Sequence, residues 1–239
     1  LEVLLLNIPA LNFAKIAADH IDDVCQQLVD DEVLTKEQIK TFELLELTSV
    51  QHRYYHEKSD DFFTLGPLDL SFTPGELVFL VGGNGSGKTT LAKLLVGLYV
   101  PEEGSIKLDG KLINNERRDQ YRQLFSAVFS DFHLFEQLLE DQHVDLDSVG
   151  NELISKLNLQ HKVQIKDGAF TSRNLSQGQR KRLALIVAYL EDRPFLLFDE
   201  WAADQDPAFK DVFYHHLLPE LKEQGKTIFV ISHDDRYFH

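Results

Sequence analysis

The sequence predicts an α/β fold in which helices cover a parallel sheet, and two observations support this prediction. Three short apolar runs, residues 77–81, 195–198 and 227–231, have the length and composition of buried parallel strands. A glycine-rich segment, residues 81–90, follows the first run and precedes leucines that recur at helical spacing. We therefore expect a strand, a glycine-rich loop and a helix to follow one another in the core of the fold.

The glycine-rich segment has the sequence VGGNGSGKTT and satisfies G-x-x-x-x-G-K-[ST], the pattern of a phosphate-binding loop (P-loop). Glycines let successive backbone N–H groups turn toward phosphate oxygens, and the N-terminus of the following helix adds a favourable partial charge. Lys88 would reach the β- and γ-phosphates of a nucleoside triphosphate, and the Thr89 hydroxyl would ligate Mg²⁺. A flexible glycine turn with a chance lysine is the alternative, which the flanking strand and helix disfavour. The expected nucleotide-binding residues are Gly82, Gly83, Asn84, Gly85, Ser86, Gly87, Lys88, Thr89 and Thr90.

Composition is that of an acidic globular protein. The 239 residues are 43% hydrophobic and 26% charged, with a formal net charge of −15. Because a phosphate backbone requires a basic face, this charge disfavours a nucleic-acid partner. The single cysteine, Cys25, excludes an internal disulfide, and no uninterrupted apolar segment reaches the roughly 18–20 residues that span a bilayer. The sequence has no methionine and starts on an apolar run, so we expect a soluble fragment of a longer polypeptide.

Residues 1–41 are expected to form an N-terminal helix and a linker. Apolar residues recur at helical spacing between 11 and 28, and residues 30–38 are mostly polar and acidic. The segment is either a helix packed on its own domain or the cytoplasmic end of a preceding membrane domain, and the residues favour neither. We place the domain boundary near Thr41, so that residues 42–239 form the second domain.

The second domain contains signals for an antiparallel β subdomain. Residues 42–55 and 68–72 are rich in β-branched, aromatic and apolar residues and are expected to pair as strands. Gly66-Pro67 is expected to be a break just before the second of these strands. Residues 105–113 predict a hairpin around Asp109-Gly110, which is a strong two-residue turn signal.

A helical insertion is expected at about residues 131–185. Its first part, residues 134–159, has a helical pattern. Outside the insertion, a further helix at residues 214–221 is expected to end at Gly225. The apolar residues expected in the core of the insertion are Leu138, Leu139, Val149, Leu153 and Leu157.

Two carboxylates follow the apolar run FLLF at residues 195–198. An acid at the carboxyl end of a buried strand lies where ligands of open α/β sheets bind. In a protein with a phosphate-binding loop, Asp199 would hold Mg²⁺, and Glu200 would accept a proton from the attacking water or orient it. The alternative is an acid that caps a helix after the strand.

The segment LSQGQ, residues 175–179, precedes a basic and then apolar helical stretch. Taken alone, it predicts only a serine N-cap and a glycine at the start of a helix. We expect the basic cluster Arg180-Lys181-Arg182 to be a solvated helix face, with contact to a partner loop as the alternative.

From about residue 42 to the C-terminus, the sequence resembles the nucleotide-binding domain of an ABC ATPase. Residues 82–89 resemble its Walker A motif, LSQGQ its LSGGQ signature, and FLLFDE its Walker B motif with the catalytic glutamate. Asp206 matches the D-loop aspartate, His233 the switch histidine and Tyr54 the aromatic residue that stacks on adenine. Alone, a strand tyrosine is more often a core residue, and a histidine after a strand is usually without catalytic function. The order of the motifs carries the resemblance.

The resemblance implies a RecA-like P-loop NTPase core, with an antiparallel β subdomain and a helical insertion that carries the signature. It implies ATP and Mg²⁺ as cofactors, with catalytic roles for Lys88, Glu200 and His233. Two copies would pair head to tail with ATP between them. ATP bound by one copy would then meet the other copy's signature residues Ser176, Gly178 and Gln179.

The sequence departs from the family pattern at two places. The family's glutamine that contacts Mg²⁺ and water is replaced by Ser130, followed by Asp131, so the metal contact is expected through water or through Asp131. The sequence also stops six residues after His233, which implies a C-terminus truncated before the family's last strands and helices.

Residues 199–207 (DEWAADQDP) and neighbouring segments are similar to exporters of cyclic peptides, including siderophore peptides and peptide microcins. That similarity implies a fused transmembrane domain that is absent from this sequence, and a place at the cytoplasmic face of the inner or plasma membrane. One alternative is a soluble ABC ATPase that acts on nucleic acid, ribosomes or a protein partner, and the charge of −15 disfavours the nucleic-acid case. Another is a regulatory module without hydrolysis, which only Ser130 favours.

Overall fold

The computed structural model describes residues 39–56, 61–135, 138, 145–172, 174–233 and 235–237. The expected N-terminal helix and most of its linker therefore lie outside the described residues, and that prediction stays a prediction. Within the described ranges, no helix combines the length and apolar character that crossing a membrane requires.

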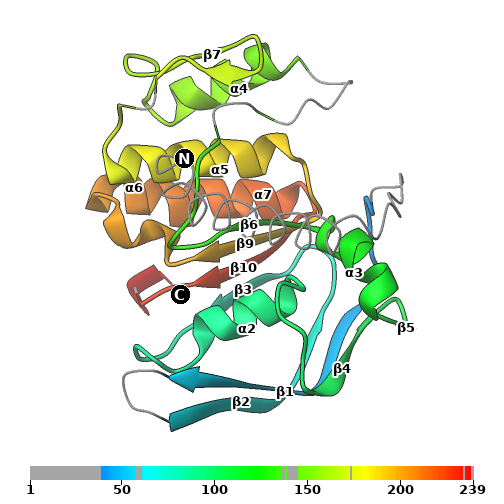
Figure 1. Cartoon of the computed structure of the whole chain (residues 1–239). Coiled ribbons are helices and arrows are strands. Elements are labelled where there is room, and N and C mark those ends of the chain that lie inside the picture. Colours follow the sequence, from blue (N-terminus) through cyan, green and yellow to red (C-terminus); the bar gives the residue numbers. More distant parts are fainter. Residues whose placement is uncertain are drawn as a thin grey trace, which may run out of the picture. The chain divides into compact units, whose positions relative to one another are not determined.

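A four-stranded parallel sheet forms the centre of the fold (Figure 1). Its strands are β3 (Leu77–Leu80), β6 (Phe125–Val128), β9 (Phe195–Asp199) and β10 (Thr227–Ile231), in the order β3-β10-β9-β6. The predicted parallel strands are thus confirmed. Strand β6 was not predicted, because its four residues, FSAV, carry too weak an apolar signal to stand out from the sequence around them.

Alternate residues of the central strands enter two different cores, one on each face of the sheet. Leu196 and Phe198 belong to the core on one face, whereas Phe195 and Leu197 belong to the core on the other. All five residues of β9 and all five of β10 are buried. Burial on both faces explains the continuous apolar runs in the sequence, and each fully buried Leu or Phe contributes roughly 1.5–3 kcal/mol.

Helices from different parts of the chain cover the two faces (Figure 1). The first face is covered by α5 (Gln177–Leu190) and by a run of helix made of α6 (Pro207–Val212), the π-turn η2 (Phe213–Leu217) and α7 (Leu218–Glu223). The second face is covered by α2 (Lys88–Leu95), which packs in the same core as the antiparallel sheet.

The antiparallel sheet has the order β2-β1-β4-β5, with β1 at Leu45–His56, β2 at Asp61–Phe72, β4 at Glu103–Leu108 and β5 at Lys111–Leu112. The predicted hairpin of β4 and β5 is confirmed. The predicted break at Gly66-Pro67 is wrong, because β2 continues through both residues. They form a bulge in which β2 has one residue more than β1, and such a bulge accommodates a proline that has no N–H to donate.

Gly104, at the start of β4, is required by a close approach of two strands. Its φ is +81°, and a Cβ there would lie 2.3 Å from the Ser49 carbonyl oxygen. We expect Gly104→Ala to lower the free energy of unfolding by about 3 kcal/mol, because backbone strain and a backbone clash add together. The matched control is Gly110→Ala, where φ is also positive but no atom lies within 4 Å, and about 1 kcal/mol is expected. Thermal unfolding of both variants measures the difference, and equal losses would contradict the prediction.

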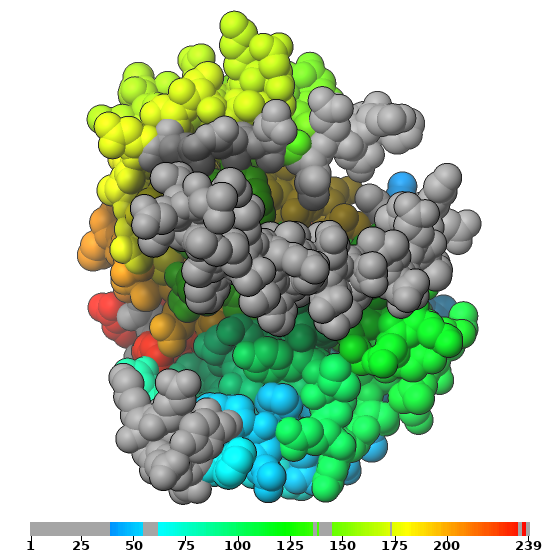
Figure 2. All heavy atoms as spheres, viewed as in Figure 1, coloured from blue at the N-terminus to red at the C-terminus, as the bar shows by residue number. Residues whose placement is uncertain are grey.

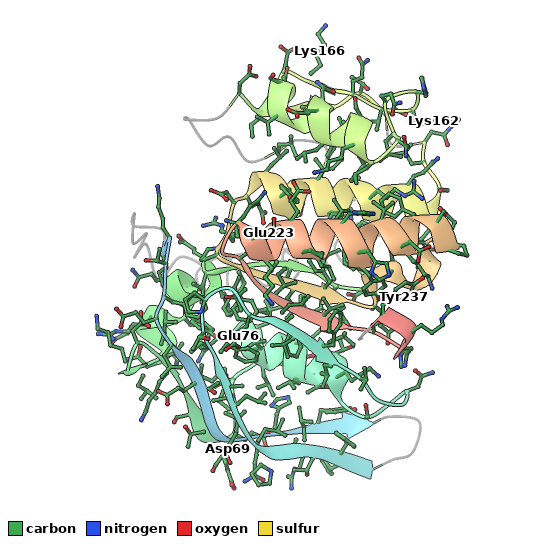
Figure 3. All side chains as sticks on the ribbon, turned by 180° about the vertical axis from the view of Figure 1, so that it is seen from behind. Asp69, Glu76, Lys162, Lys166, Glu223 and Tyr237 are labelled. Atoms are coloured by element: carbon green, nitrogen blue, oxygen red, sulfur yellow. The ribbon has the colours of Figure 1, made fainter. Side chains whose placement is uncertain are left out.

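The helical insertion lies beyond α5, at the opposite end of the described part from the antiparallel sheet (Figures 1 and 2). It contains α4 (Leu146–Lys156) and the two-stranded sheet of β7 (Ile165–Lys166) and β8 (Ala169–Phe170). A short helix, α3 (Asn115–Arg122), leads from the antiparallel sheet to β6. Lys162 and Lys166 mark the outer end of the insertion in Figure 3, and Asp69 lies at the far side of the domain.

One expected core residue of the insertion is wrongly assigned. Val149 is 42% exposed, because the buried face of α4 contains Leu146, Gly150 and Ile154. Gly150 lets the side chain of Ile165 approach the helix, where a Cβ would lie 2.3 Å from Ile165 Cδ1. Burial of Leu138 and Leu157 is confirmed, Leu153 is partly buried against the same core, and Leu139 lies outside the described residues.

Candidate active site

The predicted site residues come together at one edge of the parallel sheet. All four strands run in the same direction, so their carboxyl ends lie at this edge, where ligands of open α/β sheets bind. Ile231 pairs with both Leu80 and Asp199, which aligns the ends of β3, β9 and β10. Consequently the phosphate-binding loop, Glu200 and His233, each of which follows one of these strands, are neighbours.

The phosphate-binding loop closes around the ammonium group of Lys88. Lys88 Nζ donates to the carbonyl oxygens of Gly82 and Gly83, both at 2.9 Å, and the residue is only 7% exposed. Gly87, at the N-cap of α2, has φ 89°, and a Cβ there would lie 2.9 Å from a methyl carbon of Leu65. The loop therefore holds a buried positive charge beside a helix N-terminus, which is a suitable place for phosphate groups.

Thr89 and Asp199 join the loop to the end of β9. The Thr89 hydroxyl donates to Asp199 Oδ2 at 2.8 Å, and Asp199 is fully buried. Asp199 Oδ1 is buried without a hydrogen-bond partner among the described residues. Burial raises the pKa of the Asp199 carboxyl, the bond from Thr89 offsets part of that rise, and the charges of Glu200 and Asp131 add to it.

Glu200 connects β9 to the loop after β10. Its Oε1 lies 2.9 Å from His233 Nε2, and its backbone N–H donates to the Ile231 carbonyl at 3.0 Å. The residue has φ 52°, in the left-handed region that non-glycine residues rarely adopt. With its side chain 34% exposed, Glu200 presents a carboxylate at the sheet edge that a water molecule can reach.

Tyr54 lies on β1, in the half-buried aromatic pair that it forms with Phe63 of β2. The ring centroids are 5.2 Å apart, and Phe63 also borders Gly87 of the phosphate-binding loop. This arrangement brings the hairpin of β1 and β2 against the loop, so a base next to bound phosphates would meet aromatic side chains.

The signature segment, residues 175–179, lies on the other face of the sheet from the chain's own P-loop helix. Ser176 caps α5 and forms a capping box with Gln179. Helix α5 packs in the core opposite to the one that contains α2, so Ser176 and Lys88 of one chain flank different faces of the sheet. The structure therefore does not bring Ser176, Gly178 and Gln179 together with the other predicted ATP-binding residues.

The signature segment instead contacts the loop that follows Glu200. Gln177 Nε2 donates to Asp204 Oδ2 at 3.1 Å, and Gln205 Nε2 donates to the Gly178 carbonyl at 3.0 Å. Asp206 caps α6 by accepting from the Phe209 N–H, and this bond, with a smaller contribution from Arg182, lowers the pKa of Asp206. The loop of residues 200–206 is thus bonded to the start of α5.

Residues 65–203 match the family model described as ABC transporter, which is more than half of the chain. The chain belongs to the ABC transporter family. Members of this family bind ATP and couple its hydrolysis to transport, so the chain is an ABC ATPase domain, and the predicted family and fold are confirmed.

Two curated relatives of the ABC domain come from Pseudomonas syringae. It is 52% identical over 212 residues to the ATP-binding protein SyrD of Pseudomonas syringae pv. syringae, covering 87% of this chain and 37% of SyrD. It is 29% identical over 210 residues to the probable syringafactin export ATP-binding/permease protein SyfD of the same species, covering 81% and 31%. The chain thus spans about a third of the length of these relatives. Matching ATP-binding proteins include some named for import.

A solved structure supports the fold. The dimeric structure of MJ0796, a bacterial ABC transporter cassette, superimposes with a TM-score of 0.65 at 22% identity, covering 81% of this chain and 89% of that one. At this identity the likeness concerns the fold alone, and it agrees with an ABC domain that has both a parallel sheet and an antiparallel β subdomain.

Ser130 of the ABC domain is exposed at the carboxyl end of β6. It lines a cavity of about 490 Å³ with Phe132, His133, Leu134, Gln177 and Arg180. Asp131, the next residue, is near enough for its charge to raise the pKa of Asp199. This contribution of Asp131 is smaller than those of burial, Thr89 and Glu200.

The expectation that Arg180-Lys181-Arg182 forms a solvated face is wrong for two of its members. Lys181 is 2% exposed, and the Arg182 guanidinium binds Asp206 at 2.7 Å and stacks on the Phe209 ring. The signal was present in the sequence, because Lys181 precedes Leu185 by four residues and so lies on the apolar face of the helix. A lysine next to two arginines was assigned to solvent by its charge alone.

Proposed function

We propose that this ABC domain powers the export of a peptide, in particular a cyclic peptide, across a membrane. The observation that carries the proposal is the 52% identity to SyrD over 87% of the chain, since the similarity extends well beyond the ATP-binding motifs. The name of SyfD specifies export, which supports export as the direction of transport. The sequence resemblance to cyclic-peptide exporters supports the same direction. In this proposal the domain acts at the cytoplasmic face of the membrane, attached to a transmembrane domain.

In the proposed reaction, Glu200 accepts a proton from the water that attacks the γ-phosphate. Its carboxylate is solvent-accessible and is held by His233, which supports a role for the pair in orienting this water. Lys88 offsets the charge on the β- and γ-phosphates, and Tyr54 stacks on the adenine ring. The bond between the β-bridging oxygen and the γ-phosphorus breaks, releasing ADP and phosphate.

The residues at the end of β9 fit a Mg²⁺ ion. Asp199 offers a buried carboxylate with one oxygen unpaired among the described residues, beside the Thr89 hydroxyl. The described ranges contain no group of three or more His, Cys, Asp or Glu side chains suited to a metal ion. This suits Mg²⁺, which one or two carboxylates hold together with substrate phosphates. When bound, the ion would neutralise charge on the phosphates, with Thr89 and Asp199 as its protein ligands and Ser130 or Asp131 linked through water.

Asp199→Asn is expected to raise the stability of the domain and to lower its ATPase activity. Burial raises the pKa of Asp199 in the folded state, so the protonated carboxyl is the form that the fold favours. The stability that this residue contributes is fully present below its pKa in the unfolded chain and is lost as the pH rises through its pKa in the folded state. At neutral pH the ionised carboxylate therefore costs stability. The variant should have a higher Tm than the wild type at pH 7 without nucleotide or Mg²⁺, by a margin that shrinks in acid, and about 100-fold lower ATPase activity.

Thermal unfolding at two pH values and phosphate release measure the two effects. Asp211→Asn, which changes an exposed acid on α6, is the matched control and should alter neither quantity. A Tm below that of the wild type at pH 7 would contradict the assigned cost of burying the Asp199 charge.

The proposed active form is a head-to-tail pair of identical domains. Within one chain the signature segment and the P-loop helix pack on opposite faces of the sheet, so the signature has no nucleotide of its own to contact. In a head-to-tail pair, Ser176 and Gly178 of one copy would meet the γ-phosphate held by the other, with Gln179 keeping the capping box closed. The MJ0796 cassette, which is described as dimeric, supports this arrangement.

Transport by the natural polypeptide that contains this chain tests the function. Inverted membrane vesicles with that polypeptide should accumulate a labelled cyclic peptide in the presence of ATP and Mg²⁺, and not with a non-hydrolysable ATP analogue. ATP hydrolysis by a polypeptide that fractionates away from membranes and moves no peptide would overturn the proposal.

A further inference from the structure

Lys181, on the buried face of α5, is bonded to three residues of the loop that carries the proposed catalytic carboxylate. Its Nζ donates to the Glu200 carbonyl at 3.1 Å and lies 2.7 Å from Asp204 Oδ2. Its own backbone carbonyl accepts from Trp201 Nε1 at 2.8 Å. One helical residue therefore holds the whole turn η1 (Trp201–Asp204) together with the residue before it.

The buried ammonium group of Lys181 must be compensated by bonds within the protein, because an unpaired charge in a protein interior is costly. Lys181 is 2% exposed, whereas the side chain of its partner Asp204 is 44% exposed. The Asp204 carboxylate alone would be solvated without any lysine. The bond from the Lys181 ammonium to the Glu200 carbonyl, in contrast, can form only if the ammonium group is buried.

That carbonyl belongs to a residue in a strained conformation. Glu200 has φ 52°, and for a residue with a branched or long side chain such a conformation persists only where the surroundings hold it. Its N–H donates to the Ile231 carbonyl and its carboxylate contacts His233. Its carbonyl accepts from Lys181 Nζ at 3.1 Å and from the Ala203 N–H at 3.2 Å, so Lys181 supplies the only side-chain bond to this carbonyl among the described residues. The direction of the Glu200 carboxylate thus depends on a charge 19 residues away in the sequence.

We propose that Lys181 is a positioning residue for Glu200, which keeps the left-handed backbone of Glu200 in place and thereby aims its carboxylate at the attacking water. The inference rests on the proposed function, in which Glu200 accepts the proton of that water. Asp204 Oδ2 also accepts from Gln177 of the signature segment, so the same bond network joins the start of α5 to Glu200.

The test compares ATP hydrolysis by variants of the natural polypeptide that contains this chain. Lys181→Met keeps the length of the side chain and removes its donors, and we expect kcat to fall about 100-fold, with the KM for ATP within about threefold of the wild type. Lys181→Gln retains an amide donor and should recover part of the loss. Lys222→Met removes an exposed lysine of α7 and is the matched control, with unchanged kcat.

The double variant Lys181→Met/Asp204→Asn separates positioning from mere charge balance. It removes both charges of the pair, so no charged group is left unpaired, but the Glu200 carbonyl still lacks the ammonium donor and keeps only the bond from the Ala203 N–H. We expect its kcat to stay as low as that of Lys181→Met. Recovery of kcat in the double variant would overturn the proposal, since Lys181 would then serve only to neutralise Asp204. This variant also answers the question if Lys181→Met alone does not fold.

Two further measurements complete the test. Trp201 is the only tryptophan of the sequence and binds the Lys181 backbone, which methionine keeps, so an unchanged fluorescence maximum is expected alongside the loss of kcat. Glu200→Gln shows whether a negative result overturns only the proposal for Lys181 or also the proposed function of the site. If it is inactive while Lys181→Met matches Lys222→Met, the proposal for Lys181 falls alone. If it hydrolyses ATP like the wild type, Glu200 leaves the reaction, and both the proposed function of the site and this inference fall.

Discussion

Glu200→Gln is expected to lower the kcat for ATP hydrolysis by about 1,000-fold and to leave ATP affinity nearly unchanged. Glutamine has the same shape and can keep the contact with His233, but its amide cannot accept the proton of the attacking water. Lys88, Thr89 and Asp199, which would hold the phosphates and Mg²⁺, are untouched. The substitution therefore removes an interaction made in the transition state and preserves those made in the ground state.

The same variant should accumulate as an ATP-bound pair, because hydrolysis is the step that separates the two copies in the proposed mechanism. Single-turnover phosphate release measures the chemical step, and size-exclusion chromatography with ATP and Mg²⁺ measures the pairing. Glu223→Gln is the matched control, since Glu223 is exposed at the end of α7, on the helical layer, and lies outside the site (Figure 3). Wild-type turnover by Glu200→Gln would remove this carboxylate from the mechanism.

Lys88→Ala is expected to weaken ATP binding by about 100-fold. The Lys88 ammonium is buried inside the phosphate-binding loop, where charge-assisted hydrogen bonds to phosphate are worth about 1.5–3 kcal/mol. Without it, the carbonyls of Gly82 and Gly83 lose the ammonium donor, Gly83 keeps only its bond from the Ser86 N–H, and the loop loses the shape that it takes around the lysine.

Calorimetric titration with ATP and Mg²⁺ measures this loss of affinity. Lys93→Ala is the matched control, because it removes the same charge from the same helix at a position that faces the Tyr99 ring instead of the loop. Equal affinities for Lys88→Ala and Lys93→Ala would contradict the assignment of the phosphate site to this loop.

The sequence alone predicted the fold class and most of the residues that the structure brings together in the candidate site. The P-loop was found because its chemistry depends on consecutive residues, whose backbone N–H groups and glycines are contiguous in the chain. Asp199 and Glu200 were found because β9 is buried on both faces, which leaves a continuous apolar run before the acids. In both cases local sequence determines local geometry, so reading along the chain is enough.

Only the tertiary structure decided which distant residues meet. The contact between His233 and Glu200, the opposite faces taken by the signature segment and α2, and the hold of Lys181 on the Glu200 carbonyl depend on how elements pack. Two wrong predictions have the same origin: the charge of Lys181 predicts a solvated side chain, and the residue types of Gly66-Pro67 predict a break before a strand, whereas packing buries Lys181 and β2 continues through Gly66-Pro67. Burial and pairing are properties of the packed neighbours of a residue, and a single sequence states the residues but not which of them become neighbours.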